Sequence, residues 1–198
     1  MSQTCPDCGA DLKQFGAMAA CSICYPVRWS GVPFNYRLAK LDESDPLREL
    51  LLSDASLYLC GSVGRGKTYR AAAIVRYRVQ SGECGNRFVS LPDLLLRIRD
   101  TYGTGEESES DVILRYATAP LLVLDDLGAE KTTDAVRASL GILMDRRATD
   151  SRRRTVITGN LTLPEIAEQH GPRIASRIGG MCRIVKLTGP DRRLDGGR

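Results

Sequence analysis

Residues 61–68 have the composition and spacing of a loop that binds a chain of phosphates. They read Gly-Ser-Val-Gly-Arg-Gly-Lys-Thr and fit the pattern G-x-x-x-x-G-K-[ST]. The glycines permit backbone conformations closed to larger residues, so successive N–H groups can turn toward an anion. Lys67 can then reach the β- and γ-phosphates, and the Thr68 hydroxyl can ligate Mg²⁺. We therefore expect a nucleoside triphosphate to be bound by Gly61, Ser62, Val63, Gly64, Arg65, Gly66, Lys67 and Thr68.

Two carboxylates follow an apolar run further along the chain. Leu121–Leu124 are four consecutive apolar residues, which is typical of a strand buried on both faces of a parallel sheet. Asp125 and Asp126 end this strand, at the edge where open α/β sheets bind ligands. We expect Asp125 to bind magnesium through water and Asp126 to orient or deprotonate the attacking water. The alternative is a pair of aspartates that only caps the next turn.

A single amide follows another predicted strand, Arg154–Thr158. Asn160 comes two residues after that strand. Because parallel strands end at the same edge of a sheet, its side chain can hydrogen-bond the attacking water or the γ-phosphate beside Asp126. With the phosphate loop, these residues indicate hydrolysis rather than binding alone.

Four of the seven cysteines lie in the first 24 residues, as two C-x-x-C pairs. Disulfides are disfavoured in a cytosolic chain, so such a cluster indicates metal. Two pairs of thiolates complete a closed tetrahedral site, which predicts structural Zn²⁺ bound by Cys5, Cys8, Cys21 and Cys24. A redox pair and thiols without metal are the alternatives. Lys13 and Arg28 are the basic residues of this module, which favours contact with a protein over contact with nucleic acid.

The elements that must position these residues alternate between strand and helix. Strands are expected at 57–60, 87–90, 121–126, 154–158 and 183–187. Helices are expected at 47–52, 69–80, 92–102, 111–117, 132–149 and 172–178. This order predicts an α/β P-loop NTPase with a parallel sheet flanked by helices. The expected divisions are a zinc-ribbon-like module at 1–30, a linker or lead-in at 31–56, and an ATPase core at 57–198.

Composition sets wider bounds. The 198 residues are 42% hydrophobic with a net charge of +4, which permits contact with a polyanion without requiring it. We find no signal peptide and no apolar run of the roughly 20 residues that a membrane span needs. The expectation is a soluble cytoplasmic protein that makes no membrane contact.

Three further groups of residues have less specific interpretations. Trp29, Phe34 and Tyr36 could stack on a base, but aromatic residues near a domain junction are more often packed, and we expect packing. The lone His170 is expected to be a surface residue at a helix end. Five arginines near the end of the helix 132–149 are either a patch that faces nucleic acid or a subunit, or a solvated helix terminus: Arg146, Arg147, Arg152, Arg153 and Arg154.

The order of motifs resembles the AAA+ ATPases of the DnaC/DnaI helicase-loader and IstB family. The resemblance covers about residues 25–195 and rests on the lead-in 31–37, the segments 61–68, 121–128, 155–160 and 173–177, and the closing Gly-Pro-Asp-Arg-Arg. It implies that Asn160 is sensor 1 and that Arg177, in preference to Arg173, is an arginine finger for a neighbouring subunit. It also implies that Arg193 or Arg192 is at the sensor-2 position. The sequence stops about where the helical lid of such a protein would begin.

The resemblance implies a helicase loader that uses ATP, Mg²⁺ and a structural Zn²⁺. Its implied partners are a replicative DNA helicase, single-stranded DNA and further copies of itself, since the finger acts in trans. An isolated subunit should then be a weak ATPase. The alternatives are an IstB-like ATPase that regulates a transposase, a P-loop phosphotransferase, and a zinc adaptor that does not hydrolyse ATP.

Overall fold

The computed structural model describes residues 4–5, 12–15, 18–21, 23–104, 107–189 and 191. Within these residues five strands form one sheet in the order β4-β5-β6-β3-β7, and every neighbouring pair is parallel. The strands are β3 (Ser56–Cys60), β4 (Arg87–Ser90), β5 (Leu121–Leu127), β6 (Arg154–Gly159) and β7 (Cys182–Lys186). The predicted parallel α/β architecture is confirmed.

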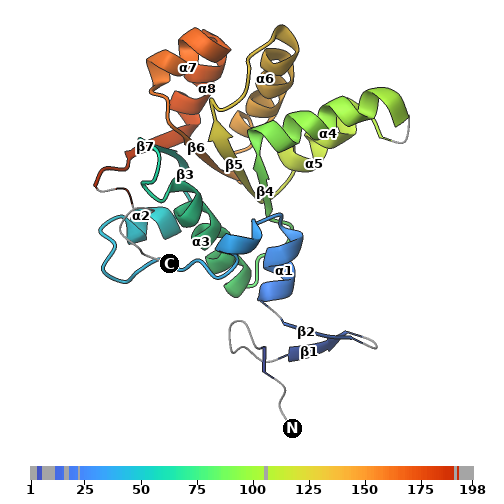
Figure 1. The fold of residues 1–198 in the computed structure, drawn as a ribbon, viewed down its shortest axis with the longest axis vertical. Helices are drawn as coiled ribbons and strands as arrows, with labels where there is room; N and C mark the ends of the chain where they lie inside the picture. The colour runs from blue at the N-terminus through green and yellow to red at the C-terminus, as the bar shows by residue number, and fades with distance from the viewer. Residues whose placement is uncertain are drawn as a thin grey trace.

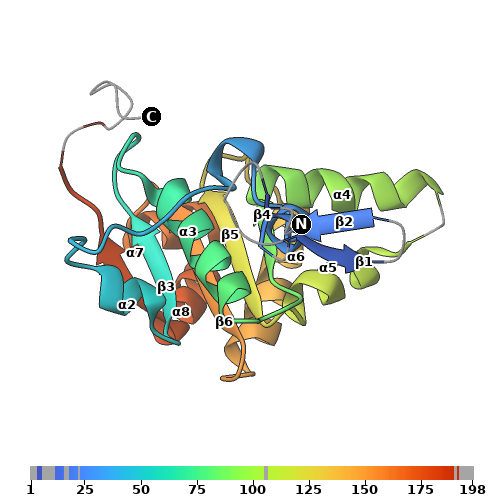
Figure 2. The ribbon, with the colours of Figure 1, turned by 90° about the horizontal axis from the view of Figure 1, so that it is seen from below.

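Helices cover both faces of the sheet (Figures 1 and 2). One face packs against α1 (Cys24–Trp29), α2 (Arg48–Leu52) and α3 (Lys67–Gln80). The other packs against α4 (Leu91–Thr104), α5 (Glu109–Ala117), α6 (Asp134–Ala148), α7 (Leu163–His170) and α8 (Pro172–Met181). Side chains alternate between these two cores, as a strand of period two requires. In β3, Leu57 and Leu59 join the α3 side, while Tyr58 and Cys60 join the α6 side.

The N-terminal part begins with a hairpin that is separate from the main sheet. Strands β1 (Leu12–Phe15) and β2 (Met18–Cys21) pair antiparallel, and α1 follows. Pro26 is in the first turn of α1, where its missing N–H needs no partner, so the helix tolerates it.

A 3-10 turn, η1 (Phe34–Tyr36), lies in the first part of the lead-in 31–56, between α1 and β3. The expected packing of the aromatic cluster is wrong for two of its three members. Trp29 is 66% exposed and Phe34 is 78% exposed. Only Tyr36 packs as expected, edge-on against Tyr69 of α3 with ring centroids 6.4 Å apart.

The predicted surface position of His170 is wrong as well. Its ring is buried at the end of α7, with Nε2 3.1 Å from Oε1 of Glu130. Burial lowers the pKa of this histidine, which favours the neutral ring. The helix α7 was missed, although Thr162 and Glu165 form a capping box at its start and the spacing of these two residues is a usable sequence signal.

The arginine cluster divides into two kinds of residue. Arg146 and Arg152 are exposed, whereas Arg147 and Arg154 are buried. Arg154 donates hydrogen bonds to the carbonyl oxygens of Ala55 and Leu51, so it joins β6 to the segment before β3. The sequence allows two interpretations of the cluster, a patch that faces nucleic acid or a subunit and a solvated helix terminus. Neither fits Arg147 and Arg154, because both side chains are buried.

Candidate nucleotide site

The phosphate loop connects the end of β3 to the first turn of α3. Gly61, Gly64 and Gly66 all have positive φ angles, of 145°, 79° and 73°. A Cβ atom on Gly61 would lie 2.5 Å from the carbonyl oxygen of Leu187, so glycine is required there by close approach as well as by conformation. The Leu187 N–H in turn donates to the Cys60 carbonyl at 2.7 Å. The chain after β7 thus supports the loop from one side.

Lys67 is the first residue of α3, and its side chain turns back over the loop. Nζ donates hydrogen bonds to the carbonyl oxygens of Gly61 at 2.7 Å and Ser62 at 2.9 Å. It also donates to Oδ1 of Asn160 at 2.6 Å. The structure therefore brings the predicted lysine, at the start of α3, into direct contact with the predicted amide, which directly follows β6.

Asp125 is buried at the end of β5, where two hydroxyl groups donate to its Oδ1 atom. Thr158 lies 2.6 Å away and Thr68 lies 3.1 Å away. Burial raises the pKa of this carboxyl to about 6, an increase that the Thr158 hydrogen bond opposes and the charge of Asp126 reinforces. Hydroxyl and carboxylate oxygens are the ligands that Mg²⁺ prefers, so Thr68 and Asp125 fit the expected metal.

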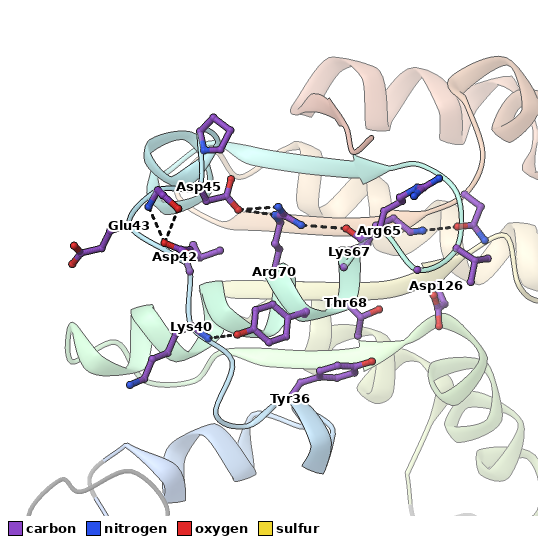
Figure 3. A pocket seen from close by; sticks show the side chains of 18 residues that line it. Tyr36, Lys40, Asp42, Glu43, Asp45, Arg65, Lys67, Thr68, Arg70 and Asp126 are labelled. Atoms are coloured by element: carbon purple, nitrogen blue, oxygen red, sulfur yellow. Dashed lines mark hydrogen bonds and ion pairs between the residues drawn. The ribbon is translucent and has the colours of Figure 1, made fainter. Parts of the chain in front are cut away.

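Asp126 takes a different orientation from its neighbour because its backbone is left-handed. Its φ angle is 59°, and it is the one non-glycine residue of the described chain with a positive φ. Its N–H donates to Oγ1 of Thr158 at 3.0 Å, and the pairing of β5 with β6 shifts register between Leu124 and Leu127. This turn leaves the Asp126 side chain exposed beside the loop, where Figure 3 shows it near Thr68. Such strain is typical of functional positions.

A cavity of about 1070 Å³ opens over the loop (Figure 3). The loop residues 63–68 line it, together with Asp126 and Asn160. The lead-in residues 40–46 and Tyr36 also line it. This volume is large enough for a nucleotide.

The lead-in is held in place by two contacts with α3. Arg70 and Asp45 form an ion pair at 2.9 Å, with both side chains largely buried. The backbone N–H of Lys40 donates to the Tyr69 hydroxyl at 3.2 Å. The sequence predicts a linker or lead-in here and no part of the nucleotide site, because no short motif marks a segment whose position depends on pairing with a distant helix.

The comparisons with known proteins agree with this geometry. Residues 47–194 match the family described as IstB-like ATP binding protein. The chain belongs to this family. The replicative helicase loader DnaC of Escherichia coli (strain K12) is 26% identical over 124 residues, which are 63% of this chain and 50% of the loader. The loader DnaI of Bacillus subtilis (strain 168) is 26% identical over 150 residues, which are 69% of this chain and 47% of DnaI. The chain thus spans about half the length of the curated relatives that it matches.

Solved structures of three proteins share the fold. The crystal structure of DnaI superposes with a TM-score of 0.65 at 25% identity, over 81% of this chain and 94% of that chain. The crystal structure of the DnaC helicase loader superposes with a TM-score of 0.64 at 24% identity, over 79% of this chain and 100% of that chain. The AMPPCP-bound DnaA from Aquifex aeolicus superposes with a TM-score of 0.61 at 18% identity, over 78% of this chain and 50% of that chain. The resemblance to the DnaC/DnaI and IstB family is confirmed, and so is the AAA+ P-loop fold.

The two candidate arginine-finger residues of this IstB-like chain lie away from its own nucleotide cavity. Arg173 and Arg177 are both on α8, on the face of the sheet opposite α3, and neither lines the cavity. Both donate hydrogen bonds to the carboxylate of Asp145 on α6. Their roles remain predictions. Arg192 and Arg193, the candidates for sensor 2, lie outside the described residues.

The four cysteines of the predicted zinc module are only partly described. Cys5 is buried, Cys21 ends β2 and Cys24 begins α1, while Cys8 lies outside the described residues. Where the structure describes side chains, no group of three or more His, Cys, Asp or Glu could hold a metal ion. The zinc site stays a prediction. Over the same part of the chain, no helix combines the length and apolarity needed to cross a membrane.

Proposed function

We propose that this protein is an ATP-dependent loader that delivers a replicative DNA helicase to single-stranded DNA. The observation that carries the ATPase half is a pair of side-chain hydrogen bonds, Lys67 to Asn160 and Thr68 to Asp125, beside a nucleotide-sized cavity that Lys67, Thr68 and Asn160 line. The sequence predicts a role for each of these side chains, either with the phosphates and the attacking water or with Mg²⁺. Lys67 and Thr68 come from the start of α3, Asp125 from β5, and Asn160 from the end of the neighbouring strand β6.

In this proposal the loop backbone and Lys67 bind the β- and γ-phosphates of ATP. Thr68 and Asp125 hold Mg²⁺, which supplies positive charge to the phosphate oxygens when it is bound. Asp126 orients the attacking water or accepts its proton, and Asn160 hydrogen-bonds the water or the γ-phosphate. Arg177 of one subunit completes the site of the next, and Arg193 acts as sensor 2. Hydrolysis by a single subunit is therefore weak.

We also propose three parts for the chain: a zinc module at 1–30 held by Cys5, Cys8, Cys21 and Cys24, a lead-in at 31–56, and the ATPase core at 57–198. The helicase is the proposed partner because the curated relatives DnaC and DnaI are named replicative helicase loaders. The family match to IstB-like proteins favours a second candidate, an ATPase that regulates a transposase.

Nucleotide binding is tested with Lys67→Ala and the matched control Lys131→Ala, an exposed lysine that does not line the cavity. We expect Lys67→Ala to weaken ATP binding at least tenfold in calorimetry and the control to leave it unchanged. Equal affinity of the two variants would show that the loop does not bind the triphosphate. The partner is tested by adding ATP and either purified replicative helicase or purified transposase to the full chain. Binding of helicase supports the loader, and binding of transposase alone supports the second candidate.

A further inference from the structure

Three aromatic residues in α1 and at the start of the lead-in are exposed on a part of the molecule that the nucleotide site does not use. Trp29, at the end of α1, is 66% exposed, and Phe34, at the start of η1, is 78% exposed. Tyr25 is 43% exposed and packs edge-on against Trp29, with centroids 5.9 Å apart. Large rings cost free energy when left in water, so the exposure of three of them within one short stretch of the sequence needs a reason.

These rings are presented by a firmly anchored segment. Val27 and Val32 are buried in the core beside α3, one on each side of Trp29. The Phe88 N–H of β4 donates to the Ser30 carbonyl at 2.6 Å, and Arg87 Nη1 donates to the Trp29 carbonyl at 3.3 Å. The backbone is therefore fixed to the sheet while the rings project outward.

Positive charge accompanies the rings. Residues 25–41 contain Arg28, Arg37 and Lys40 and no aspartate or glutamate, together with four of the eleven aromatic residues of the chain. This stretch carries a charge of +3, whereas the whole chain carries only +4. The Arg37 guanidinium lies over the Phe34 ring, 5.1 Å from its centroid. Glu83, which lines a small hollow beside Trp29, is already paired with Arg78 at 2.7 Å.

We propose that Tyr25, Trp29 and Phe34, with Arg28, Arg37 and Arg87, form a binding surface for single-stranded nucleic acid. Unpaired bases stack on the exposed rings, and the guanidinium groups contact the phosphates between them. A duplex cannot offer its base faces to these rings, so the surface selects single strands. Residues 25–41 interleave cations with aromatic residues and contain no carboxylate, and Glu83 beside Trp29 is neutralised by Arg78, so the surface favours this polyanion over a protein partner.

This surface adjoins the proposed ATP site through η1. Phe34 begins that turn, while Tyr36 ends it, lines the cavity and contacts Tyr69 of α3. This inference deepens the proposed function. It rests on that function for the idea that one protein binds both ATP and single-stranded DNA. The binding of the strand itself depends only on the surface.

Trp29 is the only tryptophan of the chain, so its fluorescence reports on this surface directly. We would titrate the full chain with oligo(dT) of about 20 nucleotides and expect saturable quenching of Trp29 fluorescence that weakens with salt.

Phe34→Ala should weaken oligo(dT) binding about five- to hundredfold. Arg37→Ala should weaken it and reduce the salt dependence by about one counterion. The matched control is Tyr102→Ala, because Tyr102 is 67% exposed but lies on α4, on the other face of the sheet. It should bind like the unaltered chain.

Three outcomes would overturn the proposal. They are no quenching by oligo(dT), equal quenching by a duplex of the same length, and equal affinity of Phe34→Ala and Tyr102→Ala. Quenching by purified helicase without quenching by oligo(dT) would assign the surface to a protein instead. ATP affinity measured on the same samples separates the two ideas. If ATP binds normally but oligo(dT) does not quench Trp29 fluorescence, only the proposed surface is rejected. If oligo(dT) quenches the fluorescence but Lys67→Ala keeps an unchanged ATP affinity, only the nucleotide site is rejected.

Discussion

Nε of Arg177 donates a hydrogen bond to Oδ1 of Asp145 at 2.7 Å, and Arg173 donates to the other oxygen of the same carboxylate. These hydrogen bonds, that of Arg177 first, lower the pKa of Asp145, so it is charged at neutral pH. The proposed finger is thus held within its own subunit, by α6. To reach the site of a neighbour, Arg177 must exchange this partner for the γ-phosphate of the next subunit.

The first prediction follows from that exchange. Arg177→Ala should lower ATP turnover by about 10³-fold or more at concentrations where the protein self-associates, because the finger adds charge to the transition state. Mixing Arg177→Ala with Asp126→Asn should restore part of the activity, since each variant supplies what the other lacks. Turnover is measured by phosphate release across a series of mixing ratios.

Arg173→Ala is the matched control for this experiment, because it removes the second arginine of the same carboxylate from the same helix. We expect a much smaller loss for this variant. Absence of rescue in every mixture, with both variants folded, would count against a finger that acts in trans. If only Arg173→Ala lowers ATP turnover, Arg173 rather than Arg177 would be the arginine finger.

The second prediction concerns the buried carboxyl of Asp125, whose pKa is raised to about 6 by burial. Because the folded state binds this proton more tightly than the unfolded chain, the carboxyl favours folding at low pH. That contribution is lost as pH rises through about 4 to 6. Asp125→Asn should therefore raise the free energy of unfolding at pH 7.5 by about 1–3 kcal/mol without nucleotide, and have little effect at pH 4. It should also abolish magnesium-dependent ATP turnover.

Urea unfolding at the two pH values measures this effect. Asp126→Asn is the matched control, because Asp126 is exposed and asparagine tolerates its left-handed backbone. We expect the control to raise stability at pH 7.5 by less than Asp125→Asn does, because it removes only the contribution of the Asp126 charge to the raised pKa, and to leave stability at pH 4 nearly unchanged. Destabilisation by Asp125→Asn at pH 7.5 would show that the Thr158 and Thr68 hydrogen bonds outweigh the cost of burial.

The third prediction concerns the cysteine pairs. Metal analysis of the purified full chain should give about one zinc per molecule, and Cys8→Ser or Cys24→Ser should remove it. Because a segment of this size has little core of its own, metal binding would supply most of its folding energy. Cys84→Ser is the control, since Cys84 is exposed and lies between α3 and β4. Zinc content that is near zero, or equal in all three variants, would contradict the four-cysteine site.

The parts of the fold that the sequence predicts well are those set by local pattern. The strand at 87–90 has the predicted bounds, and the helix predicted at 69–80 begins two residues earlier, at Lys67. Lys67, Thr68, Asp125 and Asn160 meet because parallel strands end at one edge, a consequence of topology that needs no knowledge of side-chain packing.

The parts that the sequence could not predict depend on contacts between distant segments. Asp45 becomes part of the cavity wall only because Arg70, 25 residues later, pairs with it. His170 is buried because α7 packs its end against the loop that holds Glu130. The rings of Trp29 and Phe34 look like core residues by type, and only the three-dimensional structure shows that they face solvent.

The fourth prediction tests whether a buried arginine of α6 is structural. Arg147 Nε donates to the Thr155 hydroxyl at 2.9 Å, and its Nη atoms donate to the carbonyl oxygens of Ala117, Ala119 and Arg154. These groups lie at the end of α5 and the start of β6, and they have been removed from water. Burial lowers the pKa of Arg147 to about 10, which still leaves it charged at neutral pH.

Arg147→Met should therefore lower the free energy of unfolding by about 2–5 kcal/mol, because it fills similar space and leaves these acceptors without a donor. Arg146→Met is the matched control from the adjacent, exposed position, and should change stability by less than about 0.5 kcal/mol. Both are measured by urea unfolding at pH 7.5.

If the exposed arginines of the cluster contact nucleic acid, Arg146→Met should weaken oligonucleotide binding while Arg147→Met, when folded, does not. A stable Arg147→Met protein would mean that α5 and β6 are held together by apolar packing, and that the arginine adds only specificity to their arrangement.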